Sequence, residues 1–326
     1  MNATLLPAPW KAMPDFHTAP SEETRAFNAA LEMALKNAPP IWSYPIALIR
    51  QIRANGEGIL PISGPLQDVL WRSIPNGQRA RFIEAENARG LYVHIHGGGW
   101  TFGGADQCDG RNKRLSAATG FDVMSLEYRF GPENRWPACA DDCFAGAVAA
   151  IEHAQSKGYP VFIGGESAGG HLTAVTLARL KSAGLIDQIA GTVMIYGCFD
   201  LRMTPSMKNW GDRLLVLSTP VVDWFSKNLL GDDLQGADTP EVSPLLGDLE
   251  GMPPAYFQVG DLDPLLDDSL FMAARWRAAG ASADLTVWPG GVHAFDVFDQ
   301  PIHNLPIALE SQAATATWLK GRIEAP

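Results

Sequence analysis

The sequence predicts an α/β layered sandwich built on a mostly parallel sheet of about eight strands. Short runs rich in β-branched residues alternate along the chain with alanine-rich helical patterns, and this alternation is typical of βαβ units. No internal repeat of fixed period is visible, which argues against solenoids and propellers. A chain of 326 residues can bury the large core that such a sandwich needs.

The expected strands begin with a hairpin. Two runs, 68–73 and 79–85, flank a turn that contains proline, asparagine and glycine, and this pattern predicts an antiparallel pair at the start of the sheet. Buried strands of the parallel part are expected at 91–95, 121–126, 161–163, 192–196, 255–259 and 283–288. The helices of the sandwich are expected at 109–118, 137–155, 168–182, 267–279 and 305–321.

Two regions depart from this alternation. Helical patterns around 21–36 and 45–54 precede any strand, and a long excursion at 200–240 separates two strands. Within the excursion, Ser218 supplies a helix cap, and Pro220 supplies a first-turn proline ahead of an apolar stripe. Long insertions in compact domains are usually lids or binding loops, although a decorative helical layer is the alternative.

These two regions predict the domain organisation. We expect residues 1–60 to form the N-terminal part of a helical cap and residues 200–240 to form its second segment. Residues 61–199 and 241–326 then make up the core. The cap is expected over the carboxyl edge of the sheet, where ligands bind in open α/β folds.

Composition and charge exclude several classes of protein. The 25 basic and 36 acidic side chains give a formal charge of −11, whereas nucleic-acid binding needs a concentrated basic face. The longest run without Asp, Glu, Lys or Arg, 90–105, is too short and too polar to span a membrane. The first residues lack a basic and apolar leader, so we expect a cytoplasmic protein with free cysteines. A monomer and a homodimer remain open.

The strongest chemical signal is Gly165-Glu166-Ser167-Ala168-Gly169, which lies directly between an expected strand and an expected helix. A G-x-S-x-G sequence in this context forces the serine into a tight elbow, so that its Oγ projects above the sheet. The N–H of Ala168 then lies at a helix N-terminus, where free donors favour an oxyanion. The alternative is an ordinary glycine-rich turn with an exposed serine.

A second signal is the run His96-Gly97-Gly98-Gly99-Trp100 after the strand at 91–95. Three successive glycines cost chain entropy, but they let backbone N–H groups turn toward a developing negative charge. A flexible turn or a phosphate cradle is the alternative. No phosphate-binding fingerprint accompanies the run.

Together with Tyr128-Arg129-Phe130-Gly131-Pro132-Glu133, these motifs resemble the hormone-sensitive-lipase-like, or bacterial family IV, esterases of the α/β-hydrolase superfamily. The resemblance runs from about Pro65 to the C-terminus. It implies the α/β-hydrolase fold and places the oxyanion hole at the N–H groups of Gly98, Gly99 and Ala168. The chain departs from the usual family pattern at two points, with Gly-Glu-Ser for Gly-Asp-Ser and Phe-Gly for Leu-Ala.

A nucleophilic serine needs a base and an orienting acid, which α/β-hydrolases supply in the chain order Ser, Asp or Glu, His. Asp263 stands before Pro264 and Leu265 in what looks like the family's Asp-Pro-Leu acid motif. Asp261 and Asp200 are the competing candidates. A surface carboxylate that caps the next helix is the alternative for all three.

The order rule leaves two histidines after Asp263, namely His293 and His303. His293 follows the last expected strand and is the predicted general base, whereas His303 stands at the start of the last helix and is expected to be solvated. We expect His171 to pack beneath the elbow. The family pattern implies that His96 orients the glycine run. No histidine or cysteine cluster suggests a metal site.

The sequence therefore predicts a cofactor-free serine carboxylic-ester hydrolase for small, short-to-medium acyl esters. An amidase, carbamate hydrolase or lactone hydrolase with the same triad is the enzymatic alternative, and a non-catalytic small-molecule binding protein is an alternative from another class. Five aromatic residues are candidates for lining the substrate pocket, although ordinary core positions would explain them equally well: Trp100, Phe102, Trp210, Trp224 and Phe225.

Overall fold

The computed structural model describes residues 18–75, 77–299, 303 and 305–324. The part of the predicted cap at 1–17 lies outside the described residues, as does position 76 of the predicted hairpin turn. Among the described residues, no helix combines the length and apolar character needed to cross a membrane. All four cysteines carry free thiols.

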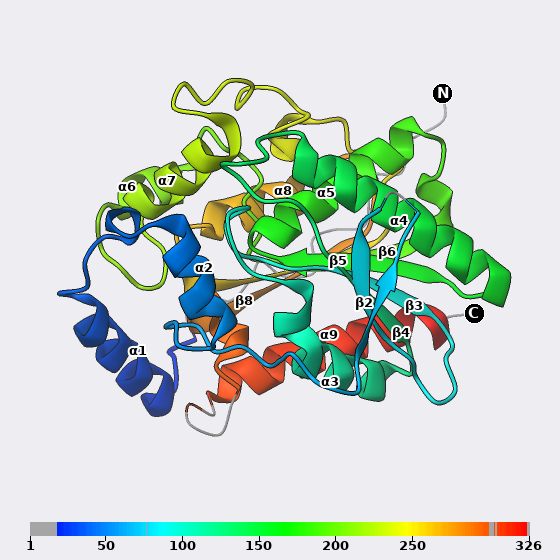
Figure 1. Cartoon of the computed structure of the whole chain (residues 1–326), viewed down its shortest axis with the longest axis horizontal. Coiled ribbons are helices and arrows are strands. Elements are labelled where there is room, and N and C mark those ends of the chain that lie inside the picture. The colour runs from blue at the N-terminus through cyan, green and yellow to red at the C-terminus, as the bar shows by residue number, and fades with distance from the viewer. Residues whose placement is uncertain (1–17, 76, 300–302, 304, 325–326) are drawn as a thin grey trace, which may run out of the picture.

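Within the described residues, eight strands form one sheet in the order β1-β2-β4-β3-β5-β6-β7-β8 (Figure 1). The first two strands form the predicted antiparallel hairpin, β2 pairs antiparallel with β4, and all later neighbours are parallel. The predicted mostly parallel sheet of about eight strands is thus confirmed. The strands are β1 (Leu70–Ser73), β2 (Arg79–Ile83), β3 (Leu91–Ile95), β4 (Asp122–Leu126), β5 (Val161–Glu166), β6 (Ile189–Ile195), β7 (Ala255–Leu262) and β8 (Ala283–Val292).

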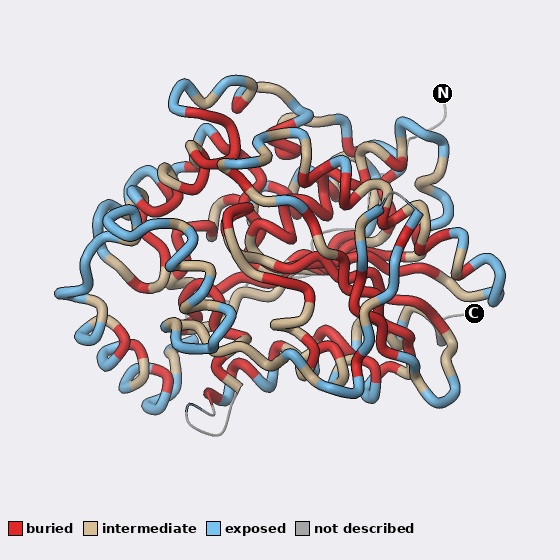
Figure 2. Tube along the Cα trace, viewed as in Figure 1, coloured by how far each residue is buried: buried red, intermediate tan, exposed pale blue. Residues whose placement is uncertain are grey.

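Helices cover both faces of the sheet (Figure 1). One face carries α4 (Ala138–Lys157), α5 (Ala168–Ser182) and α8 (Leu266–Ala278), and the other carries α3 (Asp109–Thr119) and α9 (Pro306–Glu324). Every residue of β3 and β4 is buried, because both of their faces lie under helices (Figure 2). This rigid centre fixes the ends of the strands that carry the site.

The strand β5 is longer than the predicted 161–163, since it continues to Glu166. The sequence Gly164-Gly165-Glu166 lacks the β-branched residues that predict a strand. The glycines are needed for packing, however, because a Cβ at Gly164 would lie 2.3 Å from Tyr92 Oη. Close approach of neighbouring strands therefore overrides local strand preference here.

The two regions outside the alternation lie at the same end of the molecule (Figure 1). The N-terminal region contains α1 (Glu22–Leu35) and α2 (Ile46–Ala54), and the excursion contains α6 (Pro205–Trp210) and α7 (Thr219–Leu230). An ion pair of 2.8 Å between Arg213 Nε and Glu32 Oε1 joins them. Short 3-10 helices lie at Ile41–Ser43, Ala105–Cys108, Ile186–Gln188, Pro244–Leu246 and Phe295–Val297.

The start of α7 differs from the prediction in one detail. Ser218 occupies the N-cap position, but its side chain makes no capping hydrogen bond. Instead, Thr219 Oγ1 donates to the carbonyl oxygen of Met207 at 2.6 Å and accepts from Gly211 N at 3.0 Å. The hydroxyl next to the expected cap thus joins α7 to α6.

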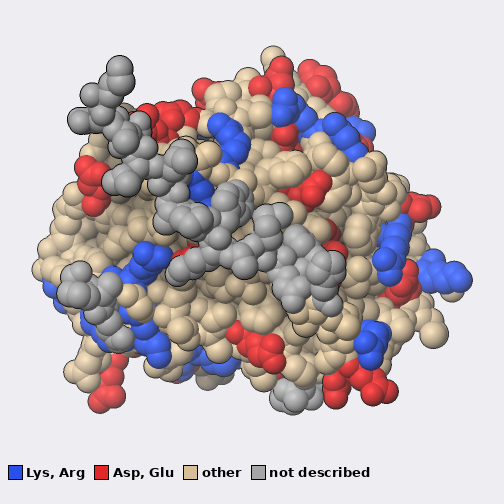
Figure 3. Space-filling view, turned by 180° about the vertical axis from the view of Figure 1, so that it is seen from behind, with Lys and Arg blue, Asp and Glu red and all other residues tan. Residues whose placement is uncertain are grey.

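Acidic and basic side chains are interspersed over the part of the rear face that described residues form (Figure 3). The sequence as a whole carries more acidic than basic side chains.

Candidate active site

Ser167 lies at a strained turn between β5 and α5. Its φ of 55° and ψ of −120° belong to a region of backbone conformation that residues with a side chain rarely adopt. The turn is tight because an added Cβ at Gly165 or Gly169 would lie 2.2 or 2.0 Å from the carbonyl oxygen of Ile95. The sequence Gly165-Glu166-Ser167-Ala168-Gly169 therefore folds as an elbow that brings the serine to the carboxyl edge of the sheet.

His293 bridges Ser167 and Asp263. Its Nε2 lies 2.8 Å from Ser167 Oγ, and its Nδ1 lies 2.8 Å from Asp263 Oδ2. Because the Asp263 carboxylate accepts a hydrogen bond, we assign the ring hydrogen to Nδ1, which leaves the lone pair of Nε2 facing the serine hydroxyl. Asp263 is 1% exposed and also accepts from Leu265 N at 2.9 Å, so its orientation is fixed.

The competing carboxylates have other partners. Asp200 pairs with Arg202 through both oxygens, at 2.9 Å to Nε and 2.8 Å to Nη2. Asp261 accepts from Gly290 N at 2.7 Å and so links the ends of β7 and β8. The structure brings Asp263 to His293, and it directs Asp200 and Asp261 to different groups.

Two other histidines are placed as expected from the sequence. His303 is exposed, with its ring against the rings of Phe27 and Phe298. His171 is buried, accepts from Trp100 Nε1 at 3.1 Å and donates to the carbonyl oxygen of Val242 at 2.7 Å.

The glycine run forms a loop beside Ser167. The φ angles of Gly98 and Gly99 are 123° and 57°. A Cβ at these positions would lie 1.9 Å from the carbonyl oxygen of Phe102 and 2.2 Å from the ring of Phe225, so only glycine fits. The loop therefore presents backbone instead of side chains to the cavity that also contains Ser167 and His293.

His96 fixes the start of this loop. Its Nδ1 donates to the carbonyl oxygen of Gly97 at 2.8 Å, and its ring stacks on Tyr128 at 4.3 Å. Burial lowers the pKa of His96 to about 4, so the ring is neutral at pH 7. The Tyr128 hydroxyl in turn donates to the carbonyl oxygen of His96 at 2.8 Å.

A cavity of about 180 Å³ opens onto Ser167 and His293. Phe102 from the core and Phe225 from α7 both line it, with ring centroids 5.5 Å apart. The N-terminal region and the excursion contribute further apolar side chains, including Ile41, Ile59, Val216, Leu217 and Val221. The cavity thus combines an apolar wall with the hydrogen-bonded serine.

Three predicted lining residues do not contact this cavity. Trp100 is only 2% exposed and points into the core, where its indole N–H bonds to His171. Trp210 Nε1 donates to the carbonyl oxygen of Arg213 at 2.7 Å, and Trp224 packs on the ring of Phe225. Of the five aromatic candidates, Trp100 and Phe225 are buried and the other three are half-buried, so aromatic character predicted neither full burial nor which rings face the cavity.

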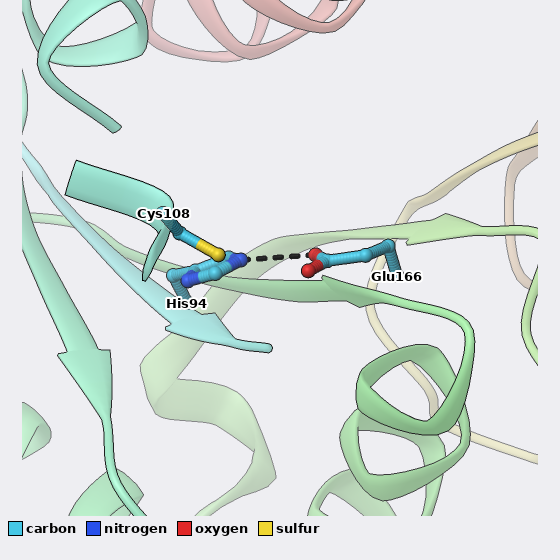
Figure 4. Close-up of side chains that lie close together, drawn as sticks. All are labelled: His94, Cys108 and Glu166. Carbon is cyan, nitrogen blue, oxygen red and sulfur yellow. Dashed lines mark hydrogen bonds and ion pairs between the residues drawn. The ribbon is translucent and has the colours of Figure 1, made fainter. Parts of the chain in front are cut away.

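A charge cluster that the sequence did not predict lies behind the elbow (Figure 4). Donor atoms of His94, Cys108 and Glu166 lie within 4.8 Å of one another, as in a metal site. Arg111 Nη2 reaches all three, however, at 3.2 Å from His94 Nε2, 3.9 Å from Cys108 Sγ and 2.8 Å from Glu166 Oε2. The guanidinium supplies the positive charge at this point, and a metal ion on the same atoms would have to displace it.

The thiol of the cluster is protonated at neutral pH. Burial raises the pKa of Cys108 to about 12, which favours the thiol over the thiolate in this cluster. The one signal of this cluster in the sequence was the glutamate at position 166, where the resembling family more often has aspartate.

Known proteins resemble this chain in sequence and in structure. Residues 92–297 match a family model described as the alpha/beta hydrolase fold. The carboxylic ester hydrolase LipN of Mycobacterium tuberculosis is 36% identical over 72% of the chain, and the match spans 63% of LipN. The carboxylesterase NlhH of the same species is 31% identical over 72% of the chain and 74% of its own length.

Solved structures resemble nearly the whole chain. An esterase of Pyrobaculum calidifontis superposes with a TM-score of 0.80 at 26% identity, over 91% of this chain and 99% of that one. A hormone-sensitive lipase from a metagenome library gives a TM-score of 0.79 at 27% identity, over 94% of this chain and 100% of its own. The structural similarity therefore extends well beyond the sheet and the helices that cover it.

Proposed function

The chain belongs to the alpha/beta hydrolase fold family, and from this premise we propose that it is a serine carboxylic-ester hydrolase acting on short-to-medium acyl esters. The observation that carries the proposal is the chain of two 2.8 Å hydrogen bonds that links Asp263, His293 and Ser167 at the mouth of an apolar cavity. Relatives named as ester hydrolases support the choice of bond.

The proposed reaction begins with attack of Ser167 Oγ on the ester carbonyl. His293 Nε2 takes the serine proton as the bond forms, and it then gives the proton to the departing alcohol. Asp263 holds the imidazole in the productive tautomer and stabilises the imidazolium. A water activated by His293 then hydrolyses the acyl-enzyme by the reverse sequence of proton transfers.

The N–H groups of Gly98, Gly99 and Ala168 form the proposed oxyanion hole. The first two belong to the loop that lines the cavity, and the third begins α5, where first-turn N–H groups have no intrahelical acceptor. Donors of this kind stabilise the negative charge that develops on the carbonyl oxygen in the tetrahedral intermediate. The proposed chemistry uses groups of the chain together with one water molecule.

We assign the cap to residues 1–60 and 200–240, and the core to 61–199 and 241–326. The described parts of both cap segments support this division, because side chains from each line the cavity above the elbow. Phe102 and Phe225 are the proposed aromatic contacts to a small-molecule ester.

The test is ester hydrolysis by the wild type and by Ser167→Ala, with p-nitrophenyl butyrate as substrate. We expect kcat of the variant to fall by three or more orders of magnitude with the fold intact, because triad residues act as a unit. Ser182→Ala, an exposed serine at the far end of α5, is the matched control and keeps wild-type kcat.

A parallel assay on p-nitroanilides shows whether the protein prefers to cleave ester or amide bonds. Faster cleavage of anilides than of esters would make the protein an amidase with the same triad. Full activity of purified Ser167→Ala would rule out the serine mechanism.

A further inference from the structure

Glu166, the residue before the proposed nucleophile, lines the cavity and directs its buried carboxylate toward three donors. Its Oε1 accepts from Gly97 N at 3.0 Å. Its Oε2 lies 2.9 Å from His94 Nε2 and 2.8 Å from Arg111 Nη2. Burial by itself would raise the pKa of Glu166, but Arg111 and His94 hold the pKa well below its usual range, so the group is ionised.

The neighbours of His94 determine its tautomer. The ionised carboxylate of Glu166 can only accept, so His94 Nε2 carries a ring hydrogen and donates it to Glu166 Oε2 at 2.9 Å. The 3.2 Å approach of Arg111 Nη2 to the same nitrogen is then a contact between two donors and not a hydrogen bond. Each protein partner of the Glu166 carboxylate is therefore a hydrogen-bond donor.

The same cluster reaches the segment that carries His293. Arg111 Nη1 pairs with Asp296 Oδ2 at 2.7 Å, and Asp296 lies in the 3-10 turn that follows His293. The Tyr196 hydroxyl donates to Asp296, and the Tyr196 ring packs against His293 with centroids 4.7 Å apart. Arg111 thus connects the elbow to the histidine segment.

The glycine loop depends on such an anchor. Three successive glycines have wide backbone freedom, and nothing in their own side chains can fix the direction of their N–H groups. Gly97 lies directly against the elbow, where an added Cβ would be 2.9 Å from the carbonyl oxygen of Glu166. The hydrogen bond from Gly97 N to Glu166 Oε1 fixes the plane of the His96–Gly97 peptide, and the bond from His96 Nδ1 to the Gly97 carbonyl oxygen fixes the next peptide, which carries the Gly98 N–H.

We propose that Glu166 is a positioning residue of the oxyanion hole, which it maintains by anchoring the N–H of Gly97 while Arg111 and His94 hold its carboxylate in place. The inference rests on the proposed function. It predicts that loss of the Glu166 charge weakens transition-state stabilisation and leaves ground-state binding of the ester nearly unchanged.

The variant Glu166→Gln tests this inference with little change of shape. Because all the partners of Glu166 are donors, the amide NH2 of glutamine must face either Gly97 N–H or the Arg111 and His94 donors, and one of these contacts is lost. We expect kcat to fall about ten- to a hundredfold, which is no more than the fall that removal of an oxyanion-hole donor causes. KM is expected to stay within about threefold of the wild type.

A trifluoromethyl ketone is the second readout. It forms a tetrahedral adduct with a nucleophilic serine and places an oxyanion in the hole, so its Ki is expected to rise by the same factor as kcat/KM falls. Asp142→Asn is the matched control, because Asp142 on α4 is a buried carboxylate that pairs with Arg129, and neither residue lines the cavity. This control is expected to lower Tm while kcat, KM and Ki stay within about twofold.

The outcomes separate the inference from the proposed function. A wild type that hydrolyses no ester and ignores the ketone would remove the proposed function. An active wild type together with a folded Glu166→Gln variant of unchanged kcat, or of reduced kcat with unchanged Ki, would overturn the role of Glu166 alone.

If Glu166→Gln does not fold, Glu166→Asp takes its place, since it keeps the charge but is one methylene shorter. Parallel changes of kcat/KM and Ki in this variant support the inference. Wild-type values of both would make Glu166 a residue needed for folding only and would overturn it.

Discussion

Three carboxylates near the carboxyl ends of β6 and β7 illustrate how local partners separate residues of the same type. Asp263 is buried and faces His293, Asp261 accepts from the backbone of Gly290, and Asp200 is neutralised by Arg202. Only the first of these can orient the imidazole that contacts Ser167. The difference lies in hydrogen-bond geometry and not in residue type or sequence neighbourhood.

We therefore predict different effects for three conservative substitutions. Asp263→Asn is expected to lower kcat by three to four orders of magnitude, because an amide facing Nδ1 stabilises the wrong tautomer. Asp200→Asn and Asp261→Asn are expected to keep kcat within about tenfold of the wild type. Measuring kcat for the three purified variants, with Tm as a check on folding, decides the matter; an inactive Asp200→Asn would contradict the assignment.

At the residue scale, motifs and chain order predict the triad residues but not the contacts around them. The elbow and the order Ser, Asp, His led to Ser167, Asp263 and His293, and the fold brings these three into one hydrogen-bonded chain. The cluster around Arg111 and Glu166 joins residues far apart in the chain, and no periodicity or spacing encodes such a contact. Which aromatic rings face the cavity depends on packing between segments, so it was also beyond prediction.

Among the elements, α2 is held mainly by polar contacts. None of its residues is buried, and Arg50 attaches it to the core. The Arg50 guanidinium donates to the carbonyl oxygens of Thr101 at 2.8 Å and Gly131 at 2.9 Å, and it pairs with Glu133 at 2.7 Å. Arg53 of the same helix lines the cavity, so the position of α2 helps to shape it.

The variant Arg50→Met is predicted to loosen the part of the cavity wall that α2 forms. The substitution removes the hydrogen bonds of Arg50 to Thr101 and Gly131 and leaves the triad untouched. We therefore expect KM to rise about three- to tenfold, while kcat stays within about threefold of the wild type. Kinetics on p-nitrophenyl butyrate provide the measurement. Arg25→Met on exposed α1, whose guanidinium bonds only to the Pro20 carbonyl among the described contacts, is the control; an equal KM for both variants would show that α2 is held by other forces.

Element positions were predictable where local pattern and packing agree. The strands with β-branched runs, such as β3 and β4, were predicted to within about a residue. The extra length of β5 came from glycines whose role is to let strands approach, and the join between α6 and α7 came from Thr219 instead of Ser218. Both differences arise from contacts between elements that no local window contains.

For the molecule as a whole, the cavity is a composite of the proposed core and the proposed cap. The core contributes the reacting groups at its carboxyl edge, and the two cap segments contribute apolar walls. The cavity of about 180 Å³ opens to the surface, and only part of an acyl chain can be in contact with its apolar wall. We therefore expect the packing of the proposed cap on the core to determine which substrate sizes are accepted.

We predict a maximum of kcat/KM for soluble esters of about four to eight acyl carbons. Each added methylene gains about 0.8 kcal/mol only while it finds an apolar wall, so the gain ends when the cavity is full. A series of p-nitrophenyl esters, with and without emulsified triglyceride as competitor, tests this limit. A maximum at long chains, or activation at the lipid surface, would contradict it.

The stability of the whole molecule should depend on pH through Asp268. This buried carboxyl of α8 accepts from Phe199 N at 2.6 Å, Asp200 N at 3.0 Å and Thr204 Oγ1 at 2.6 Å, yet burial raises its pKa to about 7. The folded protein then binds this proton more tightly than the unfolded chain does. The protonated Asp268 side chain consequently makes its full contribution to the free energy of unfolding below about pH 4, and this contribution is lost as the pH rises through about 7.

Asp268→Asn is predicted to increase the free energy of unfolding by a few kcal/mol at pH 8 and by much less at pH 5. Its carbonyl oxygen can accept from both N–H groups, while its NH2 can donate to Thr204, whose hydroxyl is free to turn. Urea unfolding at the two pH values measures the effect. Asp267→Asn, on the neighbouring half-buried position, serves as the control, and a gain that does not depend on pH would refute the explanation.

The backbone conformation of Ser167 serves the proposed catalysis but lowers the stability of the folded protein. A residue with a Cβ at φ 55° and ψ −120° costs about 1–3 kcal/mol, whereas glycine avoids this strain and adds only about 1 kcal/mol of chain entropy to the cost of folding. Ser167→Gly is accordingly expected to unfold at the same or a higher temperature than Ser167→Ala in a thermal melt, and a clearly lower Tm would contradict the strain. A lineage released from the need to hydrolyse its substrate could gain stability by giving up this serine, so we expect the serine to persist only where the proposed activity is needed.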